Sequence, residues 1–314
     1  MGEEVHRRAV PDAHGGVAGS GRPGDAAAEA GFKPLVPGMR WLLYTAAVLV
    51  LLAGFQLFVF TERSDTFFAW TILNPLAAAF LGAAYWASVA IETLAGRQRV
   101  WANARIAVPT VLVFTVLTLV ASLLHLDKFH LGAGFAAGTR LVTWAWLAIY
   151  VLVPLLMVFV LLVQARTPGS EPPRQAPLPG WLCAVLAGQA VVLLGPGVAL
   201  FAVPDQANAF WPWKLTPLLA QVTGAWLISL GVAAVHALYE RDARRLRPAA
   251  VGYLLLVVLQ VIALARYPGL FASGAAAGII YVVVLASMLV VGAAGLILGL
   301  PPGIPAHRNG RNPA

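Results

Sequence analysis

The chain has 314 residues, of which 60% are hydrophobic and only 11% are charged, and its formal net charge is +8. Soluble domains are about 25% charged, so this composition excludes an ordinary soluble protein and indicates an integral membrane protein. The basic residues are spread over several loops rather than gathered in one patch, and we expect no nucleic acid among the partners.

Eight apolar runs are long enough to cross a hydrocarbon core of about 30 Å, which takes roughly 20 helical residues. We therefore expect an all-α integral membrane protein in which these runs are eight transmembrane helices. They lie near residues 41–60, 75–95, 105–126, 140–164, 181–203, 217–239, 249–266 and 275–300.

The segments outside these runs divide the chain. Residues 1–38 are rich in Gly, Ala, Pro and charge, and predict a disordered cytoplasmic tail. A first transmembrane unit of four helices covers 39–166, and a Pro-rich cytoplasmic linker covers 167–180. A second unit of four helices covers 181–301, and a cytoplasmic tail covers 302–314.

The distribution of Lys and Arg predicts the orientation. Sixteen of the 21 lie on the side that holds the N-terminus: Arg7, Arg8, Arg22, Lys33, Arg40, Arg97, Arg99, Arg105, Arg166, Arg174, Arg241, Arg244, Arg245, Arg247, Arg308 and Arg311. The other five are Arg63, Lys128, Arg140, Lys214 and Arg266. By the positive-inside rule both termini are cytoplasmic, and anionic lipid headgroups are the expected partners on that side. The basic run 240–247 is expected to be a solvated or lipid-facing loop.

The sequence lacks the residues and motifs that several common active sites and cofactor sites require. Cys183 is the only cysteine, so there is no disulfide framework and no thiolate metal site. The chain has no GxxxxGK[ST], HExxH or GxSxG motif, and we assign no catalytic residue and no cofactor. A haem held by two histidines is excluded because His125 and His130 lie on one side of the membrane and His236 on the other.

The chain resembles itself at an offset of 142 residues, with a one-residue gap after an aromatic cluster. The aligned pairs include Asp65 with Asn208, Trp70 with Trp213, Asn74 with Thr216, Gly82 with Gly224 and Arg105 with Arg247. Asn74 and Thr216 each precede a proline, which predicts a helix N-cap followed by a residue that needs no hydrogen bond in the first turn. Because four helices is an even number, we expect two tandem parallel repeats related by a pseudo-twofold axis along the membrane normal.

Polar side chains lie at helical spacing on one face of the third and the seventh helix. They are Thr115, Thr118, Ser122 and His125 in the first repeat, and Tyr253, Gln260 and Tyr267 in the second. Thr118 aligns with Gln260 and His125 with Tyr267, so we expect one shared inner face that lines an outward-open vestibule on the axis. The alternative is that these groups make interhelical hydrogen bonds, worth about 0.6 kcal/mol each on average.

The favoured hypothesis is a carrier or binding module for a small amphipathic or lipidic molecule, with an outward-facing site between the repeats. The polar face would bind the ligand, Trp70 and Trp213 would gate it or stack on it, and Asp65 and Asn208 would complete the rim. One alternative is a membrane scaffold or accessory subunit. Another is a membrane-embedded enzyme that acts at the outer interface with Asp65, His125, Asp127 and His130.

Three further features have a simpler explanation beside the functional one. Glu92, near the cytoplasmic end of the second helix, is expected to reach toward Arg97 or Arg99 rather than to face a site. The repeat argues against pairing Glu92 with His236, because the two would face different directions. The metal candidates His125, Asp127 and His130 match no known ligand spacing, and hydration of polar loop residues explains them as well. Gly195-Pro196-Gly197 predicts a kink or local unwinding of the fifth helix.

At Asp65–Leu76 and at Thr118–His130, with its Leu-Leu-His-Leu-Asp core, the sequence resembles a family of uncharacterised multi-pass membrane proteins of GC-rich bacteria. An excess of Arg over Lys and abundant Ala, Gly and Pro fit the same source. The resemblance covers the membrane region. It implies a plasma-membrane location but no activity and no functional residues.

Overall fold

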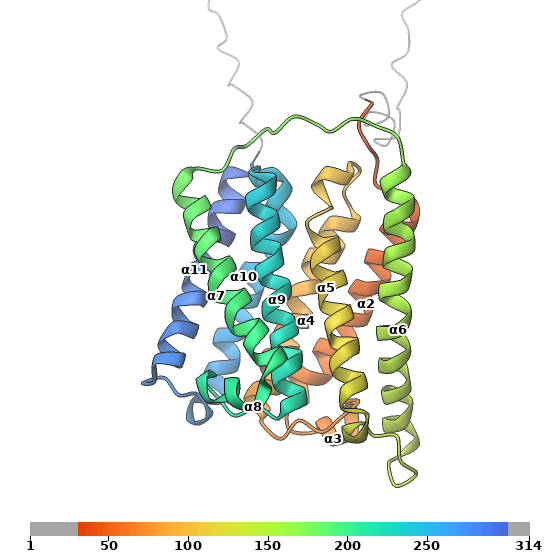
Figure 1. Ribbon diagram of the computed structural model, residues 1–314, viewed down its shortest axis with the longest axis vertical. Coiled ribbons are helices and arrows are strands. Elements are labelled where there is room, and N and C mark those ends of the chain that lie inside the picture. Colours follow the sequence, from red (N-terminus) through yellow and green to blue (C-terminus); the bar gives the residue numbers. More distant parts are fainter. Residues whose placement is uncertain (1–30, 301–314) are drawn as a thin grey trace, which may run out of the picture.

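The computed structural model describes residues 31–300, whose long helices form a single bundle (Figure 1). Within these residues eight helices are long and apolar enough to cross a membrane, as predicted. They are α2 (Pro37–Val59), α4 (Pro75–Gly96), α5 (Ala107–Leu124), α6 (Ala137–Arg166), α7 (Gly180–Ala202), α9 (Pro217–Glu240), α10 (Ala243–Arg266) and α11 (Ala276–Leu298). The predicted tails lie outside the described residues except for 31–38.

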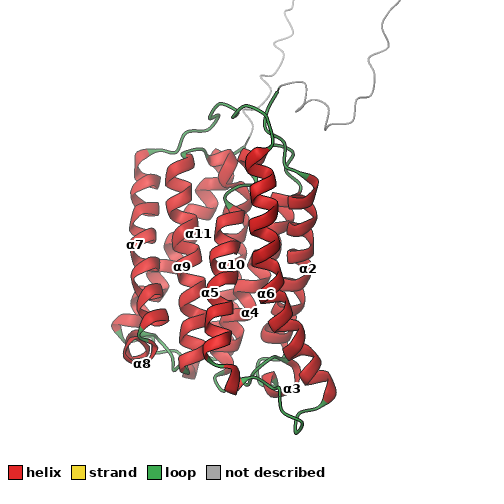
Figure 2. Cartoon of the chain, turned by 45° about the vertical axis from the view of Figure 1, so that its right-hand side comes forward, coloured by secondary structure: helices red, strands yellow, loops and turns green. Residues whose placement is uncertain are grey.

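Short elements occupy the connections between these helices. They are α3 (Ser64–Phe67), α8 (Pro204–Ala207) and the 3₁₀ turns η1 (Trp101–Asn103), η2 (Leu126–Lys128), η3 (Asn208–Phe210) and η4 (Pro268–Leu270). All eight long helices run between two sets of loops (Figure 2). Residue 31, residue 300 and the linker between α6 and α7 lie at one end, which we call the basic end; α3 and α8 lie at the opposite end, the cap end (Figure 1).

The helices pack in two layers of four. One layer runs α6, α5, α9, α7, and the other runs α2, α4, α10, α11. Helices α4 and α9 lie at the centre, contact each other and are the most buried of the eight. Each layer takes two helices from the first half of the chain (α2–α6) and two from the second (α7–α11). The halves therefore interleave instead of forming two separate bundles.

The predicted caps are confirmed. The Asn74 side-chain oxygen accepts hydrogen bonds from the N–H groups of Leu76 and Ala77 at 3.0 and 3.4 Å. The Thr216 hydroxyl oxygen accepts from the N–H of Leu219 at 3.4 Å. Asn74 also donates to the Lys214 carbonyl at 3.1 Å, so the start of α4 is tied to the loop that leads into α9.

Backbone hydrogen bonds of the loops recur in the two halves. The Leu35 N–H donates to the Arg99 carbonyl (2.8 Å), and the Leu178 N–H donates to the Arg241 carbonyl (3.3 Å) in the second half. Likewise, the bond from Trp101 N–H to Lys33 C=O (2.9 Å) matches that from Ala243 to Ala176 (2.7 Å). At the other end, the bond from His130 N–H to Ala69 C=O (3.0 Å) matches that from Ala272 to Pro212 (3.0 Å). In every pair, the donor and the acceptor of the second half are the residues that the sequence alignment, with its one-residue gap, places opposite those of the first half. The loops at both ends of the bundle are thus joined in the same way in each half.

The basic run before α10 differs from the prediction. Helix α10 begins at Ala243, six residues earlier than expected, because the Asp242 carboxylate accepts a hydrogen bond from the Arg244 N–H at 2.9 Å and caps the helix. Glu240, Asp242 and Arg245 are buried. The run is therefore a helix start packed against the linker and not a loop, and only part of it, such as Arg241 and Arg247, is exposed as expected.

Two aligned glycines lie where helix backbones come closest. A Cβ on Gly82 of α4 would lie 2.5 Å from the Phe58 nitrogen of α2, and a Cβ on Gly224 of α9 would lie 2.6 Å from the Gly197 oxygen of α7. In lipid, helices associate through such close contacts because the bilayer supplies little hydrophobic drive. These two crossings bind the outer helices α2 and α7 to the central ones.

Replacing either glycine tests this packing. Gly82→Ala and Gly224→Ala place a methyl group against backbone that has no rotamer to change, and each should lower the free energy of unfolding by roughly 1–3 kcal/mol. Thermal unfolding in detergent measures the effect. Gly188→Ala on α7 is the matched control, since its added Cβ meets nothing within 4 Å. Equal melting temperatures for Gly224→Ala and Gly188→Ala would contradict the assignment.

Candidate functional site: two adjoining cavities

A cavity of about 90 Å³ lies between the two layers, and we call it the central cavity. Residues of α2, α4, α5, α6, α9 and α10 line it, so both halves of the chain contribute. Its polar lining residues are Tyr85, Ser88, Glu92, Thr110, Thr115, Tyr150, Ser229 and Tyr253. The first three share one stripe of α4, which turns them together into the interior.

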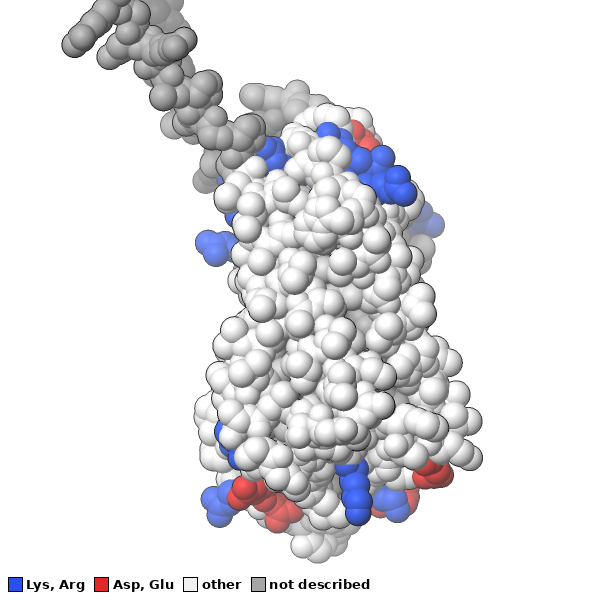
Figure 3. Space-filling model, turned by 90° about the vertical axis from the view of Figure 1, so that its left-hand side faces the viewer, with Lys and Arg blue, Asp and Glu red and all other residues white. Residues whose placement is uncertain are grey.

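A larger cavity of about 470 Å³, the lateral cavity, is lined mainly by α7, α9, α10 and α11. Its lining is apolar apart from a few groups such as Gln260, Tyr281 and Trp211, and contains no Lys, Arg, Asp or Glu. Phe210 and Ile280 line it and are 81% and 53% exposed, so the cavity opens on the side of the bundle. On that side, charged side chains gather toward the two ends of the molecule (Figure 3).

The two cavities adjoin each other. Ala84, Trp226, Leu230 and Leu256 line both. The Trp226 ring lies in this shared wall, 4.0 Å between centroids from the Phe114 ring. The side chains of this shared wall therefore separate the lateral cavity, on the flank of the bundle, from the central cavity.

Glu92 is the acidic residue of the central cavity. It is 1% exposed, and its Oε2 has no hydrogen-bond partner among the described residues. Arg97 and Arg99 are exposed and make no ion pair with it. The expectation that Glu92 reaches toward these arginines is wrong, because α4 is a central helix and this face of it is covered by neighbouring helices.

The structure does not place the predicted polar face on an open vestibule. Helices α4 and α9 occupy the centre and separate α5 from α10, which carry the two copies of that face. Thr118 and Ser122 are fully buried. The Ser122 hydroxyl donates to the Thr118 carbonyl at 2.8 Å and accepts from the Trp146 ring N–H at 3.1 Å.

Three further members of that face bond to neighbouring helices and loops. His125 donates from Nε2 to the Gln221 side-chain oxygen of α9 at 2.9 Å. Gln260 donates to the Phe80 carbonyl of α4 at 3.1 Å and accepts from the Tyr281 hydroxyl at 2.9 Å. The Tyr267 hydroxyl lies 2.5 Å from that of Thr61. These bonds fit the alternative interpretation, although the buried Thr118 hydroxyl has no partner among the described residues. Of the predicted ligand groups only Gln260 lines one of the two cavities, while Thr115 and Tyr253 of the same face line the central one.

The two aligned tryptophans are packed inside aromatic clusters. Trp70 is 2% exposed and lies against Phe68, Phe129 and Trp146; Trp213 is 4% exposed and lies against Phe80, Phe271 and Tyr281. Neither lines the central or the lateral cavity. Trp211, two residues before Trp213, lines the lateral cavity instead.

The aligned residues Asp65 and Asn208 do not have the same structural role. Asn208 donates to the Leu215 carbonyl at 2.9 Å and accepts from the Leu215 N–H at 3.0 Å, which closes the loop before α9. In the first half the Ser64 hydroxyl does the same, bonding the N–H and C=O of Ile72 at 2.8 and 3.2 Å. Asp65 itself is exposed and accepts from Thr66 at 3.4 Å. The closing residue is therefore Ser64, one position before the aligned Asp65.

The metal candidates do not converge. The buried His130 donates from Nδ1 to the Phe68 carbonyl at 3.0 Å, and its Nε2 lies 2.9 Å from the Thr71 hydroxyl. Asp127 is exposed, and the hydrogen bond from Lys128, at 2.7 Å, lowers the pKa of its carboxyl group. Within residues 31–300 no group of three or more His, Cys, Asp or Glu side chains is arranged to hold a metal ion.

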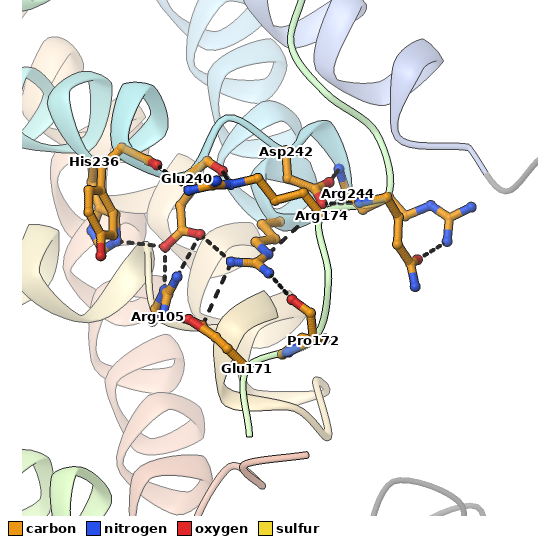
Figure 4. A network of polar contacts seen from close by, with 11 residues as sticks. Arg105, Glu171, Pro172, Arg174, His236, Glu240, Asp242 and Arg244 are labelled. Atoms are coloured by element: carbon orange, nitrogen blue, oxygen red, sulfur yellow. Dashed lines mark hydrogen bonds and ion pairs between the residues drawn. The ribbon is translucent and has the colours of Figure 1, made fainter. Parts of the chain in front are cut away.

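A buried ion cluster at the basic end was not anticipated (Figure 4). Glu240, the last residue of α9, is fully buried and accepts hydrogen bonds from Arg105, from Arg245 at 2.7 Å and from His236 at 3.1 Å. Glu171 of the linker pairs with Arg105. The only signal in the sequence is the spacing of His236, Glu240 and Arg245, which places them within about one helical turn of the α9–α10 junction.

This cluster joins three parts of the chain. Arg105 precedes α5 in the first half, Glu240 and Arg245 belong to the second, and Arg245 also donates to the linker carbonyl of Pro172 at 2.6 Å. Burial lowers the pKa of Arg105, but the hydrogen bonds and charges of Glu240 and Glu171 outweigh it and raise that pKa. Arg105 therefore stays charged, and we assign the ion cluster a structural role, since it holds the start of α5, the α9–α10 junction and the linker together.

Comparison with known proteins adds no assignment. No protein family, no curated protein and no solved structure matches this chain.

Removing the central carboxylate of the ion cluster tests its structural role. Glu240→Gln removes the carboxylate shared by Arg105, Arg245 and His236 and leaves the two buried guanidinium groups with the half-exposed Glu171 and the more distant Asp242. The free energy of unfolding should fall by about 3–5 kcal/mol. Thermal unfolding of the purified protein in detergent measures this. Glu171→Gln is the control, because Glu171 is half exposed and its pairs contribute little. If the Glu240→Gln protein were as stable as the Glu171→Gln protein, the structural role of the ion cluster would be refuted.

Proposed function

We propose that this protein is a carrier or binding module for a small amphipathic or lipidic molecule that enters the lateral cavity from the bilayer. The observation that carries the proposal is an apolar cavity of about 470 Å³, open between α7 and α11 and adjoining the polar central cavity. Ligand pockets typically enclose 300–1,000 Å³ and combine apolar walls with a few placed polar groups. A lipid-facing entrance selects ligands that partition into the membrane.

The lining offers such a ligand a small number of polar contacts. The hydrogen-bonded Gln260 and Tyr281 lie in the wall near the cap end. Helix α7 stays continuous through Pro196, but proline has no N–H, so the Val192 carbonyl lacks its usual helical donor. Val192 and Pro196 both line the lateral cavity. A hydroxyl or amide on the ligand would find acceptors there.

We further propose that the chain is a tandem duplication of a four-helix unit, with the ligand site between the repeats. The matched backbone hydrogen bonds, the two caps and the two glycine crossings support this arrangement. The pseudo-twofold axis would pass between α4 and α9. Both cavities take lining residues from both halves, as a site between repeats requires.

The charge distribution supports an orientation in which the basic end faces the cytoplasm of a bacterial plasma membrane. A polar cavity of about 500 Å³ at that end is lined by three arginines and one acid, Arg244, Arg245, Arg247 and Asp242, together with Gln98 and Asn103. We propose anionic lipid headgroups as its occupants. The lateral cavity, lined by the end of α7 and the start of α11, would then face the outer leaflet.

Filling the lateral cavity tests the proposed function. Ala277→Phe places a ring among its lining residues, and photolabelling of the protein by a fatty alcohol that carries a diazirine should fall about tenfold at Val192 and Ile280. Peptide mass spectrometry locates and quantifies the label. Ala187→Phe is the matched control on α7, because Ala187 is exposed and lines neither cavity. Equal labelling of wild type and both variants would favour a scaffold without a ligand.

Removing basic side chains tests the lipid contact. Arg244→Gln with Arg247→Gln should weaken retention of an anionic phospholipid by about 1 kcal/mol per residue, roughly fivefold each. Native mass spectrometry of protein in detergent with added phosphatidylglycerol counts the bound lipids. The control is Arg97→Gln with Arg166→Gln, which removes equal charge from exposed positions at the same end. The same loss in both pairs would show that only net charge matters.

A further inference from the structure

We infer that the central cavity binds the ammonium group of an amphipathic amine at Glu92. This rests on the proposed function and specifies its ligand class. The ligand would be a molecule with one basic nitrogen and an apolar body, with the nitrogen at Glu92 and the body toward the lateral cavity.

The first argument is that Glu92 is unlike the other buried acids of the chain. Glu240 is bonded to Arg105, Arg245 and His236, and Asp242 accepts from the N–H groups of Gln175 and Arg244. Glu92 is equally buried, yet its Oε2 has no partner among the described residues. Buried carboxylates are normally paired, and one left unpaired inside a membrane helix indicates a functional site.

The second argument is that the cavity supplies no cation of its own. Its lining contains no Lys, Arg or His, and its other titratable groups are the tyrosines Tyr85, Tyr150 and Tyr253. The Tyr85 and Tyr150 hydroxyls bond to each other at 2.7 Å. A positive charge beside Glu92 therefore has to arrive with the ligand.

The third argument concerns the remaining acceptors. Thr110, Thr115 and Ser229 donate to carbonyls of their own helices at 2.8, 3.0 and 2.8 Å. Ser88 lies one helical turn before Glu92 on the same face of α4 and lines the same cavity. An ammonium group has three donors, and the Glu92 carboxylate and the Ser88 hydroxyl are acceptors within one turn of each other.

Size and shape limit the ligand. Ala84, in the wall shared by both cavities, and Glu92 are eight residues apart on α4, which corresponds to about 12 Å along the helix. The central cavity measures only about 90 Å³, so it accepts an ammonium group on a slender chain. Aromatic rings of Tyr85, Phe114 and Trp226 border this path, and ring faces attract cations.

The charge balance permits entry from lipid. An isolated carboxylate is costly in this environment, so the empty site carries the neutral acid. An amine enters as the neutral free base; the O–H bond of Glu92 breaks, an N–H bond forms, and the proton passes to the nitrogen. The result is an ammonium–carboxylate pair with the same total charge as the reactants. No net charge crosses the bilayer in this step.

The test compares two photoreactive probes of equal chain length, an alkylamine and an alkyl alcohol that each carry a diazirine. In wild type the amine should label lining residues of the central cavity, such as Tyr150 and Ile149. Glu92→Gln should reduce that labelling about 10- to 100-fold, which corresponds to the loss of a charge-assisted hydrogen bond. Glu92→Asp keeps the carboxylate and should restore part of it. The alcohol should label wild type and Glu92→Gln alike.

The outcomes separate the two proposals. Equal amine labelling of the central cavity in wild type and Glu92→Gln, with the lateral cavity still labelled, would overturn the role of Glu92 and leave the proposed function standing. Absence of labelling by both probes in both cavities would overturn both. Because Glu92 has no partner to lose, Glu92→Gln should also melt at or above the wild-type temperature, whereas a purely structural carboxylate would destabilise the protein on removal, as expected for Glu240→Gln.

Discussion

The close packing of the outer helices on the two central ones is the constraint on which the rest of the structure depends. Lipid offers helices no hydrophobic reason to associate, so the contacts must come from backbone approach and shape. Gly82 and Gly224 permit that approach for α2 on α4 and for α7 on α9. Helix α4 then packs on α10, and α9 on α5, each across the boundary between the halves. The interleaving of two layers follows from these four contacts.

That arrangement decides which polar groups are used for packing. With α4 and α9 at the centre, several polar side chains of α5 and α10 are satisfied by neighbouring helices, as Ser122 is by Trp146 and Gln260 by Tyr281. At the basic end the same interleaving brings Arg105 against Glu240 from the other half. Glu92 is the contrast, because it faces a cavity instead of a partner. A protein that satisfies its other buried acids retains this one unsatisfied.

The two cavities relate the unpaired Glu92 to ligand binding. An apolar cavity that opens toward lipid and adjoins a small polar one provides a gradient of environments from the flank of the bundle to its centre. An amphipathic molecule matches that gradient with its own two parts. The loops at the cap end, closed by Ser64 and Asn208, and the ion cluster at the basic end stabilise the helices around it.

The sequence alone predicts the eight spans and the N-caps at Asn74 and Thr216, because run length and capping chemistry are local properties. It also pointed to Gly82 and Gly224. It did not determine which helices are neighbours: the polar faces of α5 and α10 were correctly expected to point inward, but what they meet depends on α4 and α9 lying between them. Likewise the isolation of Glu92 and the pairing of Glu240 arise from contacts between residues far apart in the chain. Only the tertiary structure decided those, because the energy of a buried charge depends on what surrounds it and not on its own helix.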